Sequence, residues 1–552
     1  MTFQKMATRR GMPCLACGLA VLALALGRGS YAAIPQPAEE VVLHVNQGDA
    51  RAADRNTGSE REPLRTIGEG ARRAVANRQR SAATRVVIHP GVYRESVVVD
   101  VPSARAAAPP IVFEGTRAGA VIVSGADVLG DWQPAGPPHV YRRRWPYSWG
   151  AVEVPRDWAP VARLLRAQPI VLRRELLVVD GQMLEQTLRL DDMRARERTF
   201  FVGHSAAGGT ETLAWIHLAA GTRIDSALVE AAARPTVFAA TGATNLVVRN
   251  LVFRHANTPL QDSAVVFDRC ASVLVEDCDM SSNNWTGLGV RESRDVTLRR
   301  VSARFNGIGG FGVWRVRNLI VDTCEASYNN WRGARGGFTS WAVGQKFLSV
   351  HGARFTDYRA VGNHATGLWF DTDNTDVVVE RAHLCRNDVN GVSLEASPGP
   401  VVIRHSRICD NREAGVFASS ASQVTLEDNE IDGNRGEQIS APWLADEHAS
   451  TEVVNFETGR RAAVQTSHWS MTGNVVSAGG NALLFAIGRW EWFLRTLVSD
   501  RNTWRHANNR DVFGVYGRNG SPPSRLDFRR WQLATGVDVR SDFQLGGERS
   551  RP

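Results

Sequence analysis

Lysine is almost absent from this sequence. The 552 residues include 65 lysines and arginines, yet only positions 5 and 346 are lysine. Arginine stays charged in proteins, whereas the lysine ammonium is compact and can lose its proton. Arginine fills nearly every other basic position of this chain. A lysine outside the N-terminal segment therefore indicates a need for a compact ammonium group, and we expect a functional role for Lys346.

Cysteine is also scarce. Of seven cysteines, Cys14 and Cys17 lie in the N-terminal apolar segment. The other five are Cys270, Cys278, Cys324, Cys385 and Cys409. They lack the spacing of a zinc site, and their odd number excludes a fully paired disulfide framework within one chain. We predict neither a metal centre nor a cofactor.

Apolar runs long enough to cross a bilayer are missing as well. The segment CLACGLAVLALAL follows Arg9 and Arg10 and precedes the small-residue sequence SYAA, an order typical of an export signal. We predict that residues 1–32 are a signal peptide cleaved near Ala32, and that the protein is periplasmic or secreted. Losing its four basic residues lowers the formal net charge from +8 to +4, which indicates no nucleic-acid partner.

From about residue 244 the chain repeats itself every 23 or 24 residues. Each repeat has a β-rich run, such as NLVVRN or DVVVER, followed by Asn, three residues and Gly. The pairs are Asn283/Gly287, Asn306/Gly310, Asn329/Gly333, Asn363/Gly367, Asn387/Gly391 and Asn411/Gly415, and Asn434 continues the series. This period predicts a solenoid of stacked strands in which the asparagines form a hydrogen-bonded ladder. Cys385 and Cys409, each two residues before a ladder asparagine, should stack as packed thiols, although a spacing of about 4.8 Å would permit a disulfide.

The asparagine series aligns the coils and predicts which side chains face outward. Within GLWFD, Leu368 and Phe370 should point inward and Trp369 and Asp371 outward, because strand side chains alternate. The outward position eight residues after each asparagine gives a surface column of Arg291, Trp314, Gly337, Asp371, Glu395 and Ser419.

Asp371 and Glu395 are neighbours in that column. Like charges directly opposite one another destabilise paired strands, so a purely structural surface would avoid them. Such a pair splits its titration, and carboxyls about 5–5.5 Å apart suit retaining glycoside hydrolysis. Two solvated acids or a cation site are the alternatives.

Residues around the pair suit a sugar site, since flat aromatic and polar side chains bind saccharides. The candidates for substrate binding are Arg291, Trp314, Trp341, Lys346, His364, Trp369 and Asp373. The spacing from Asn329 to Asn363 is 34 residues, and we predict that the extra residues, with Trp341 and Lys346, form a loop above the acidic pair.

The repeat resembles the right-handed parallel β-helix proteins, a group rich in glycoside hydrolases and polysaccharide lyases. PLRTIGEGARRAVAN is similar to their N-terminal capping helix, and GLWFD and GVSLE to the catalytic strands of the β-helical β-xylosidases, which carry an inserted β-sandwich. The resemblance implies that Asp371 is a nucleophile, that Glu395 is the acid/base, and that the substrate is a β-xyloside-like poly- or oligosaccharide.

We therefore predict an all-β protein built on a right-handed parallel β-helix. After the signal peptide, the predicted parts are a cap with the first coils at 40–125, an inserted β-rich, sandwich-like domain at 126–236, the main β-helix with the active face at 237–445, and C-terminal coils with a cap at 446–552.

Two other functions remain open. A polysaccharide lyase would use Lys346 as the base, with a calcium ion held by Asp371, Asp373 and Glu395 to neutralise a uronate. A groove that binds uronates usually needs several cations, whereas the surface column contains one, Arg291, which counts against the lyase. A non-catalytic carbohydrate-binding solenoid would explain the tryptophans but not the stacked acids.

Overall fold

A computed structural model gives the structure of the chain. It describes residues 40–101, 108–154, 163, 165–204, 211–334, 345–442, 450–488, 491–516 and 524–546. The predicted signal peptide, Gly337 and Trp341 lie outside these ranges. No helix within them is long and apolar enough to cross a membrane.

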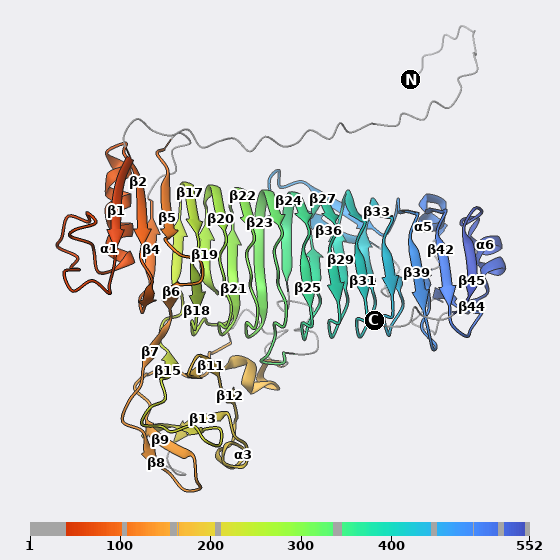
Figure 1. Ribbon diagram of the computed structural model, residues 1–552. Helices are drawn as coiled ribbons and strands as arrows, with labels where there is room; N and C mark the ends of the chain where they lie inside the picture. The colour runs from red at the N-terminus through yellow and green to blue at the C-terminus, as the bar shows by residue number, and fades with distance from the viewer. Residues whose placement is uncertain are drawn as a thin grey trace, which may run out of the picture. The chain divides into compact units, whose positions relative to one another are not determined.

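The predicted parallel β-helix is confirmed: successive coils pair strand on strand, in parallel, in three stacks within the described ranges (Figure 1). The first stack, called here the site stack, contains β4 (Val97–Asp100), β16 (Phe238–Thr241), β19 (Ser263–Asp268), β21 (Thr286–Arg291), β23 (Gly309–Asp322), β24 (Lys346–Thr356), β26 (Leu368–Asp371), β29 (Val392–Ser397), β32 (Val416–Ala421), β35 (Ile439–Ala441), β40 (Phe485–Gly488) and β43 (Phe513–Tyr516).

The other two stacks complete each coil. The second contains β1 (Glu40–Val45), β2 (Ala83–Ile88), β5 (Ile111–Gly115), β17 (Thr244–Arg249), β20 (Ala271–Glu276), β22 (Arg294–Arg299), the later halves of β23 and β24, β27 (Thr375–Glu380), β30 (Val401–Arg404), β33 (Val424–Glu427), β38 (Ser470–Thr472) and β41 (Val498–Asp500). The third contains β3 (Gly91–Tyr93), β6 (Val121–Ser124), β18 (Val252–Arg254), β25 (Arg359–Val361), β28 (His383–Cys385), β31 (Arg407–Cys409), β34 (Glu430–Asp432), β39 (Val475–Ala478), β42 (Thr503–His506) and β45 (Asp542–Leu545).

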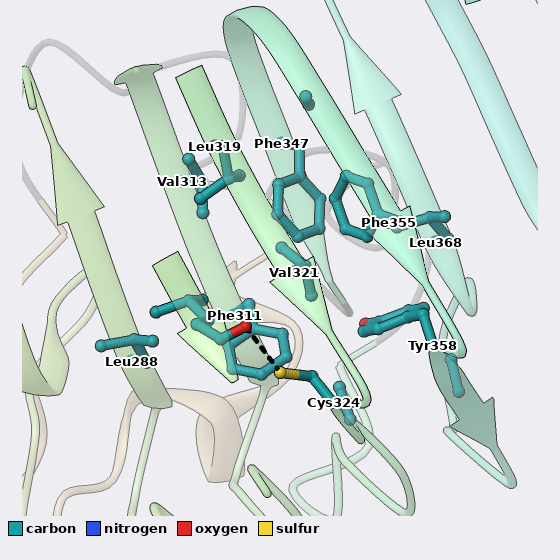
Figure 2. Packing of buried hydrophobic residues seen from close by; sticks show 14 of the residues in the cluster. Leu288, Phe311, Val313, Leu319, Val321, Cys324, Phe347, Phe355, Tyr358 and Leu368 are labelled. Atoms are coloured by element: carbon teal, nitrogen blue, oxygen red, sulfur yellow. Dashed lines mark hydrogen bonds between the residues drawn. The ribbon is translucent and has the colours of Figure 1, made fainter. Parts of the chain in front are cut away.

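The interior of the solenoid is apolar at the positions that the alternation predicts. Leu368 and Phe370 on β26 are fully buried. Phe347 packs against Phe370 at 5.7 Å between ring centres. Its ring also stands edge-on to that of Phe355 at 4.9 Å (Figure 2). Each such side chain contributes about 1.5–3 kcal/mol relative to an exposed one. These inward residues fix which neighbours must face outward.

The asparagine ladder forms as predicted, and it is buried. Asn363 donates from its backbone N–H and its side-chain amide to Oδ1 of Asn387, at 3.2 and 2.9 Å. Asn387 does the same to Asn411, at 3.0 Å for both bonds. The series runs from Asn283 to Asn434 and ends on the side chain of Gln438. Each turn of the solenoid is thereby tied to the next.

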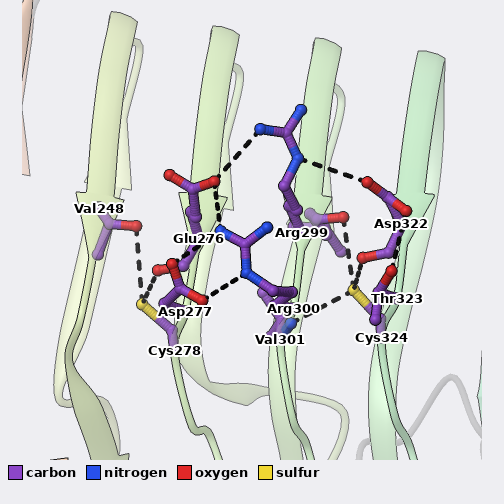
Figure 3. A network of polar contacts seen from close by, with 11 residues as sticks. Val248, Glu276, Asp277, Cys278, Arg299, Arg300, Val301, Asp322, Thr323 and Cys324 are labelled. Atoms are coloured by element: carbon purple, nitrogen blue, oxygen red, sulfur yellow. Dashed lines mark hydrogen bonds and ion pairs between the residues drawn. The ribbon is translucent and has the colours of Figure 1, made fainter. Parts of the chain in front are cut away.

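Charges on the outer face of the second stack alternate in sign from coil to coil. Arg299 on β22 lies 3.2 Å from Glu276 on one neighbouring coil and 3.4 Å from Asp322 on the other (Figure 3). Beside it, Arg300 Nε lies 2.6 Å from the carboxylate of Asp277. This surface follows the rule that unlike charges stabilise adjacent strands.

A helix packs at each end of the β-helix. At the N-terminal end, α1 (Ile67–Gln79) begins at the N-cap Thr66 and buries Ile67, Ala71 and Ala74 against the first coils. At the C-terminal end, Trp531 of α6 (Phe528–Thr535) is fully buried and stacks on Phe513 at 5.0 Å. The open ends of the stacks are thus covered, which protects the unpaired strand edges.

A β-rich insertion leaves the β-helix after β6 and returns before β16. Its strands form two small sheets, and its helices are short. The elements are β7 (Ala126–Val128), β8 (Gln133–Pro134), β9 (Val140–Arg144), η2 (Pro169–Leu172), β10 (Leu177–Val179), β11 (Gln182–Met183), β12 (Glu185–Gln186), α3 (Leu190–Ala195), β13 (Thr199–His204), β14 (Thr212–His217) and β15 (Val229–Ala232).

The insertion is attached to the turns that precede the site stack. Leu165 and Val171 pack against Trp285 and Ile308, each of which lies two residues after a ladder asparagine. The buried guanidinium of Arg332 donates to Asn284 Oδ1 at 2.7 Å, to the Ile170 carbonyl at 3.0 Å and to the Glu175 carbonyl at 2.8 Å. Burial lowers the pKa of Arg332 to about 9.

One expectation about the third stack was wrong. Cys385 and Cys409 are in register on β28 and β31 with their Cα atoms 4.5 Å apart, and they form a disulfide rather than a packed thiol pair. The other three cysteines outside the N-terminal segment are buried and free.

Candidate active site

The acidic pair lies on adjacent strands of the site stack. Asp371, the last residue of β26, is in register with Glu395 on β29, as predicted. Their neighbours Phe370 and Leu394 are fully buried in the solenoid, so both carboxyls point outward. Parallel strands place the two Cα atoms about 4.8 Å apart. Unlike the alternating charges of the second stack, this position sets two like charges side by side.

Lys346 contacts one member of the pair. It begins β24, on the coil before Asp371, and its Nζ lies 2.6 Å from Oδ2 of Asp371. The other carboxylate oxygen, Oδ1, accepts a hydrogen bond of 2.7 Å from the Thr372 hydroxyl. The side chains of Lys346 and Asp371 are only 12% and 14% exposed, so solvent screens their contact weakly. The carboxylate of Asp371 is held in place at both oxygens.

Glu395 has a different environment. Burial raises the pKa of its carboxyl, and the charge of Asp371 raises it further, whereas Lys346 and the Trp369 side chain partly offset the rise. The indole Nε1 of Trp369 is buried without a hydrogen-bond partner of good geometry in the described part of the chain, so its effect on Glu395 is one of proximity. The site therefore combines a carboxyl whose pKa is raised with a carboxylate that has an ammonium counter-charge.

The surface column differs from the prediction at one coil. Leu348, not Gly337, is in register with Trp314 and Asp371. All the extra residues of this repeat lie before β24 in the chain. The position eight residues after Asn329 is therefore not yet in the strand. Gln345 closes the insertion: its side chain accepts a bond of 2.8 Å from the backbone N–H of Gly310. Lys346 therefore lies in the strand beside the acidic pair and not in the loop that was predicted above it.

The predicted aromatic residues have unequal positions. Trp314 is 38% exposed, two coils before Asp371, and the Arg315 guanidinium lies 4.6 Å from its ring centre. Trp369 points outward but is only 2% exposed, because Lys346 Nζ covers its ring at 4.2 Å. Trp314 can offer an open face to a ligand. Trp369 instead packs with its ring beneath Lys346 and lies next to Glu395.

The other predicted binding residues lie around the pair rather than against it. Arg291 is ion-paired with Asp262 at 2.8 Å. His364 is exposed on the turn before β26, with Nδ1 2.7 Å from the Asp388 carboxylate. Asp373 is 1% exposed and accepts a bond of 2.8 Å from the Phe456 backbone N–H. Its carboxylate holds a neighbouring hairpin and does not join Asp371 and Glu395.

That hairpin, β36 (Ser450–Val454) with β37 (Arg461–Gln465), runs along the ends of the site-stack strands. Its contacts step from coil to coil. The Thr451 hydroxyl bonds Ser420, Val453 and Val464 pack on Ala396, Phe456 bonds Asp373, and Glu457 reaches His351 and Arg317. Sequence periodicity could not reveal it, because the hairpin lies across the coils and not within one. The hairpin therefore lies where the strands of the acidic pair end, and the insertion lies beside the turns from which these strands begin.

The hairpin tip is held by a group that can titrate. His351 on β24 places Nδ1 2.6 Å from Glu457 and Nε2 3.1 Å from Asp373. Burial lowers the pKa of His351, but the two carboxylates outweigh it and the pKa is raised overall. Burial raises the pKa of Glu457, yet bonds from His351 and Arg317 lower it below its usual value. We call these four residues, His351, Asp373, Glu457 and Arg317, the hairpin latch.

The described residues form no group of metal ligands around the acidic pair. The one group of three possible metal ligands in those ranges is His383 with Cys385 and Cys409, and its two cysteines are disulfide-bonded. The three acids of the lyase alternative do not converge, because Asp373 is directed to the hairpin.

Comparison with known proteins supports the fold. The family of right-handed β-helix regions matches residues 238–431, which confirms the predicted hand of the solenoid. The solved structure of XylC in complex with xylose is similar with a TM-score of 0.63 at 12% identity, over 92% of this chain and 86% of that one.

Two further solved structures are similar at lower TM-scores. The A-module of the Azotobacter vinelandii mannuronan C-5 epimerase AlgE4 has a TM-score of 0.45 at 13% identity, over 88% of this chain and 95% of that one. A glycoside hydrolase has 0.44 at 11%, over 87% and 95%. No curated protein sequence matches. The family match and the likeness to XylC show the right-handed parallel β-helix fold.

Proposed function

We propose that this protein is an exported carbohydrate-active enzyme, a retaining glycoside hydrolase with Asp371 as nucleophile and Glu395 as acid/base. The observation that carries the proposal is the register of these two residues on adjacent parallel strands, with the pKa of Glu395 raised. A Cα spacing of about 4.8 Å between paired strands is compatible with carboxyls about 5–5.5 Å apart, a separation that leaves no room for a water and favours direct attack on the sugar.

The two steps follow from the positions of the groups. Protonated Glu395 gives its proton to the leaving glycosidic oxygen while an Asp371 oxygen forms an ester bond to the anomeric carbon. Glu395, now a carboxylate, takes a proton from water, which attacks the same carbon and releases Asp371. A carboxylate oxygen has a second lone pair, so Lys346 and Thr372 can stay in contact while Asp371 reacts.

A neutral, β-xyloside-like saccharide is the proposed substrate. Trp314 offers an exposed aromatic face in the column of the acidic pair, and the similar solved structure of XylC contains xylose. An N-terminal export signal, predicted from the sequence, would bring the enzyme to polysaccharides outside the cytoplasm. The proposed mechanism uses no cofactor.

The described contacts do not favour a uronate lyase. A lyase base would need to abstract a carbon-bound proton, but Lys346 is engaged by Asp371 at 2.6 Å. A purely binding solenoid would have no reason to keep two acids side by side. These alternatives become outcomes of the test.

Purified protein should be assayed with p-nitrophenyl β-xyloside and, in parallel, with polygalacturonate and alginate. We expect release of nitrophenol, complete loss in Asp371→Asn, and rescue of Glu395→Gln by azide to give a glycosyl azide that keeps the anomeric configuration. Glu395→Gln should slow substrates with poor leaving groups far more than activated ones. An unsaturated, ultraviolet-absorbing product from a uronate polymer, or an inverted product, would overturn the proposal.

A further inference from the structure

A groove lies against the hairpin, and its lining includes neither Asp371 nor Glu395. It has a volume of 830 Å³ and is bounded by β37, by the turns after β29 and β32, and by the first turn of α5 (Glu491–Thr496). Residues such as Pro398, Gln423, Thr425, Gln465, His468 and Trp492 line it. Nothing in the proposed mechanism uses these residues.

The lining is uncharged. None of the described residues that line this groove is Asp, Glu, Lys or Arg. By contrast, a groove of 520 Å³ at the hairpin tip is lined by Arg294, Arg317, Asp295 and Glu457. On a chain with 22% charged residues, a groove with hydroxyl, amide and imidazole groups but no ions suits a neutral polar ligand.

Trp492 is the aromatic wall of the groove. It is 51% exposed, and its ring stands edge-on to His468 at 5.9 Å between ring centres. The next residue, Phe493, is fully buried and packs edge-on against Trp469 at 5.8 Å. The short helix is also tied to the chain at His468, whose backbone N–H donates to the Thr496 hydroxyl at 2.9 Å. The ring of Trp492 is therefore about half exposed to solvent, while the contacts of Phe493 and Thr496 hold its helix in place.

Polar groups face the same space. Gln423 donates from Nε2 to the Pro398 carbonyl at 3.2 Å, which orients its amide and leaves the amide oxygen as an acceptor. The side chains of Thr425 and Gln465 make no hydrogen bond with any other described residue. A flat apolar wall beside fixed hydrogen-bonding groups matches a pyranose ring, which has apolar C–H faces and hydroxyls at its edge.

The groove has the length of a short oligosaccharide. Its floor crosses three coils, at Pro398, at Gln423 and at Ser467, so it extends about 10 Å along the axis. That is the length of about two linked pyranose rings. Pro398 lies three residues after Glu395, so the groove begins beside the strand of the acidic pair.

We infer that this groove is a non-catalytic binding site for a neutral oligosaccharide segment, with Trp492 as its stacking platform. The inference rests on the proposed function for the choice of saccharide, but it concerns different residues. A longer substrate would be held here while another part of the same or a neighbouring chain reaches the acidic pair.

Xylohexaose binding should be measured by calorimetry on the full-length Asp371→Asn protein, which leaves both sites in place. Two binding sites are expected per chain. Adding Trp492→Ala should remove one of them or weaken it about tenfold or more, and Trp492→Phe should retain part of the affinity. Leu533→Ala, at a residue 79% exposed on α6, is the matched control and should change nothing. Thermal melts should show that all variants fold.

Activity separates this inference from the proposed function. In otherwise wild-type protein, Trp492→Ala should leave kcat/KM for p-nitrophenyl β-xyloside unchanged and raise KM for polymeric xylan. A single xylohexaose site that is unaffected by Trp492→Ala, no binding of neutral oligosaccharides, or binding of polygalacturonate alone would overturn the inference. If the wild-type protein hydrolyses no aryl glycoside but still binds xylohexaose through Trp492, the proposed function fails and the groove stands.

Discussion

The ammonium of Lys346 lies 2.6 Å from the carboxylate of Asp371, and this contact makes the two acids of the pair chemically different. Asp371 and Glu395 occupy equivalent positions on adjacent strands. Within the described ranges, Asp371 is the member of the pair that has a cation in direct contact, whereas burial and the neighbouring charge raise the pKa of Glu395. A division of labour between acid and nucleophile needs such an asymmetry.

Replacing Lys346 should therefore damage catalysis more than folding. Lys346→Met keeps the length of the side chain but removes the charge, so Asp371 loses the group that orients it. We expect kcat/KM on an aryl xyloside to fall about 10- to 100-fold, with little change in melting temperature. Lys346→Arg keeps the charge with a planar head that fits differently, and should retain part of the activity. Wild-type activity in Lys346→Met would show that this lysine has no role in the reaction.

The raised pKa of Glu395 should appear in the pH dependence of activity. The residue must be protonated to act as an acid, so kcat/KM should fall as the pH rises through its pKa. Lys346 lowers this pKa, so the alkaline limb of the Lys346→Met profile should move to higher pH. An alkaline limb that does not move would argue that another group sets it.

The same raised pKa has a consequence for stability. A carboxyl whose folded pKa lies above its unfolded value contributes stability that is lost as the pH rises through the folded pKa. Glu395→Gln cannot ionise. Between the unfolded and the folded pKa of Glu395, the free energy of unfolding of this variant should therefore fall less with rising pH than that of the wild-type protein, as measured by urea denaturation.

The hairpin latch should hold best at intermediate pH. The raised pKa of His351 means that its contribution is present at low pH and lost as the pH rises through its folded pKa. The lowered pKa of Glu457 means that its contribution is lost as the pH falls through its folded pKa. Amide hydrogen exchange of residues 450–465, corrected for intrinsic rates, should show greatest protection between these two limits.

A variant of the latch and a control test this directly. His351→Gln should lower hairpin protection near neutral pH and remove its alkaline dependence. The groove beside His351 is also lined by Arg317, Asp295 and Asp376. The substitution should leave the positions of these side chains unchanged. His405→Gln, where the Asp428 carboxylate is 3.9 Å away, is the control. Equal protection in His351→Gln and the wild-type protein would mean that the hairpin is held by its other contacts.

Five of the repeat glycines should resist substitution for a steric reason, namely Gly287, Gly310, Gly367, Gly391 and Gly415. A Cβ added at Gly391 would lie 2.7 Å from the carbonyl oxygen of Gly415 and 2.5 Å from a methyl group of Ile408. Gly391→Ala should lower the free energy of unfolding by about 1–3 kcal/mol, the cost of overpacking. Gly130→Ala, where a Cβ would meet nothing within 4 Å, should change it by less than about 0.5 kcal/mol in the same denaturation assay.

Much of the site followed from the repeat alone. Asparagines stack at one fixed point of each coil, and strand side chains alternate, so counting from Asn363 and Asn387 sufficed to pair Asp371 with Glu395. Counting failed at Gly337, because an insertion shifts the start of the strand by an amount that only the fold reveals. Trp369 was correctly oriented outward, but alternation carries no information about the lysine that covers it.

The sequence by itself determined the β-helix, its ladder and the pairing of the two acids, because these depend on local periodicity repeated from coil to coil. The tertiary structure alone decided the rest. The hairpin crosses five coils and meets Asp373, whose partner Phe456 lies 83 residues away in the chain. The burial of Trp369 under Lys346 and the uncharged groove at Trp492 likewise arise from contacts between distant segments. No periodicity encodes such contacts, because they depend on how segments outside the repeat pack onto the coils.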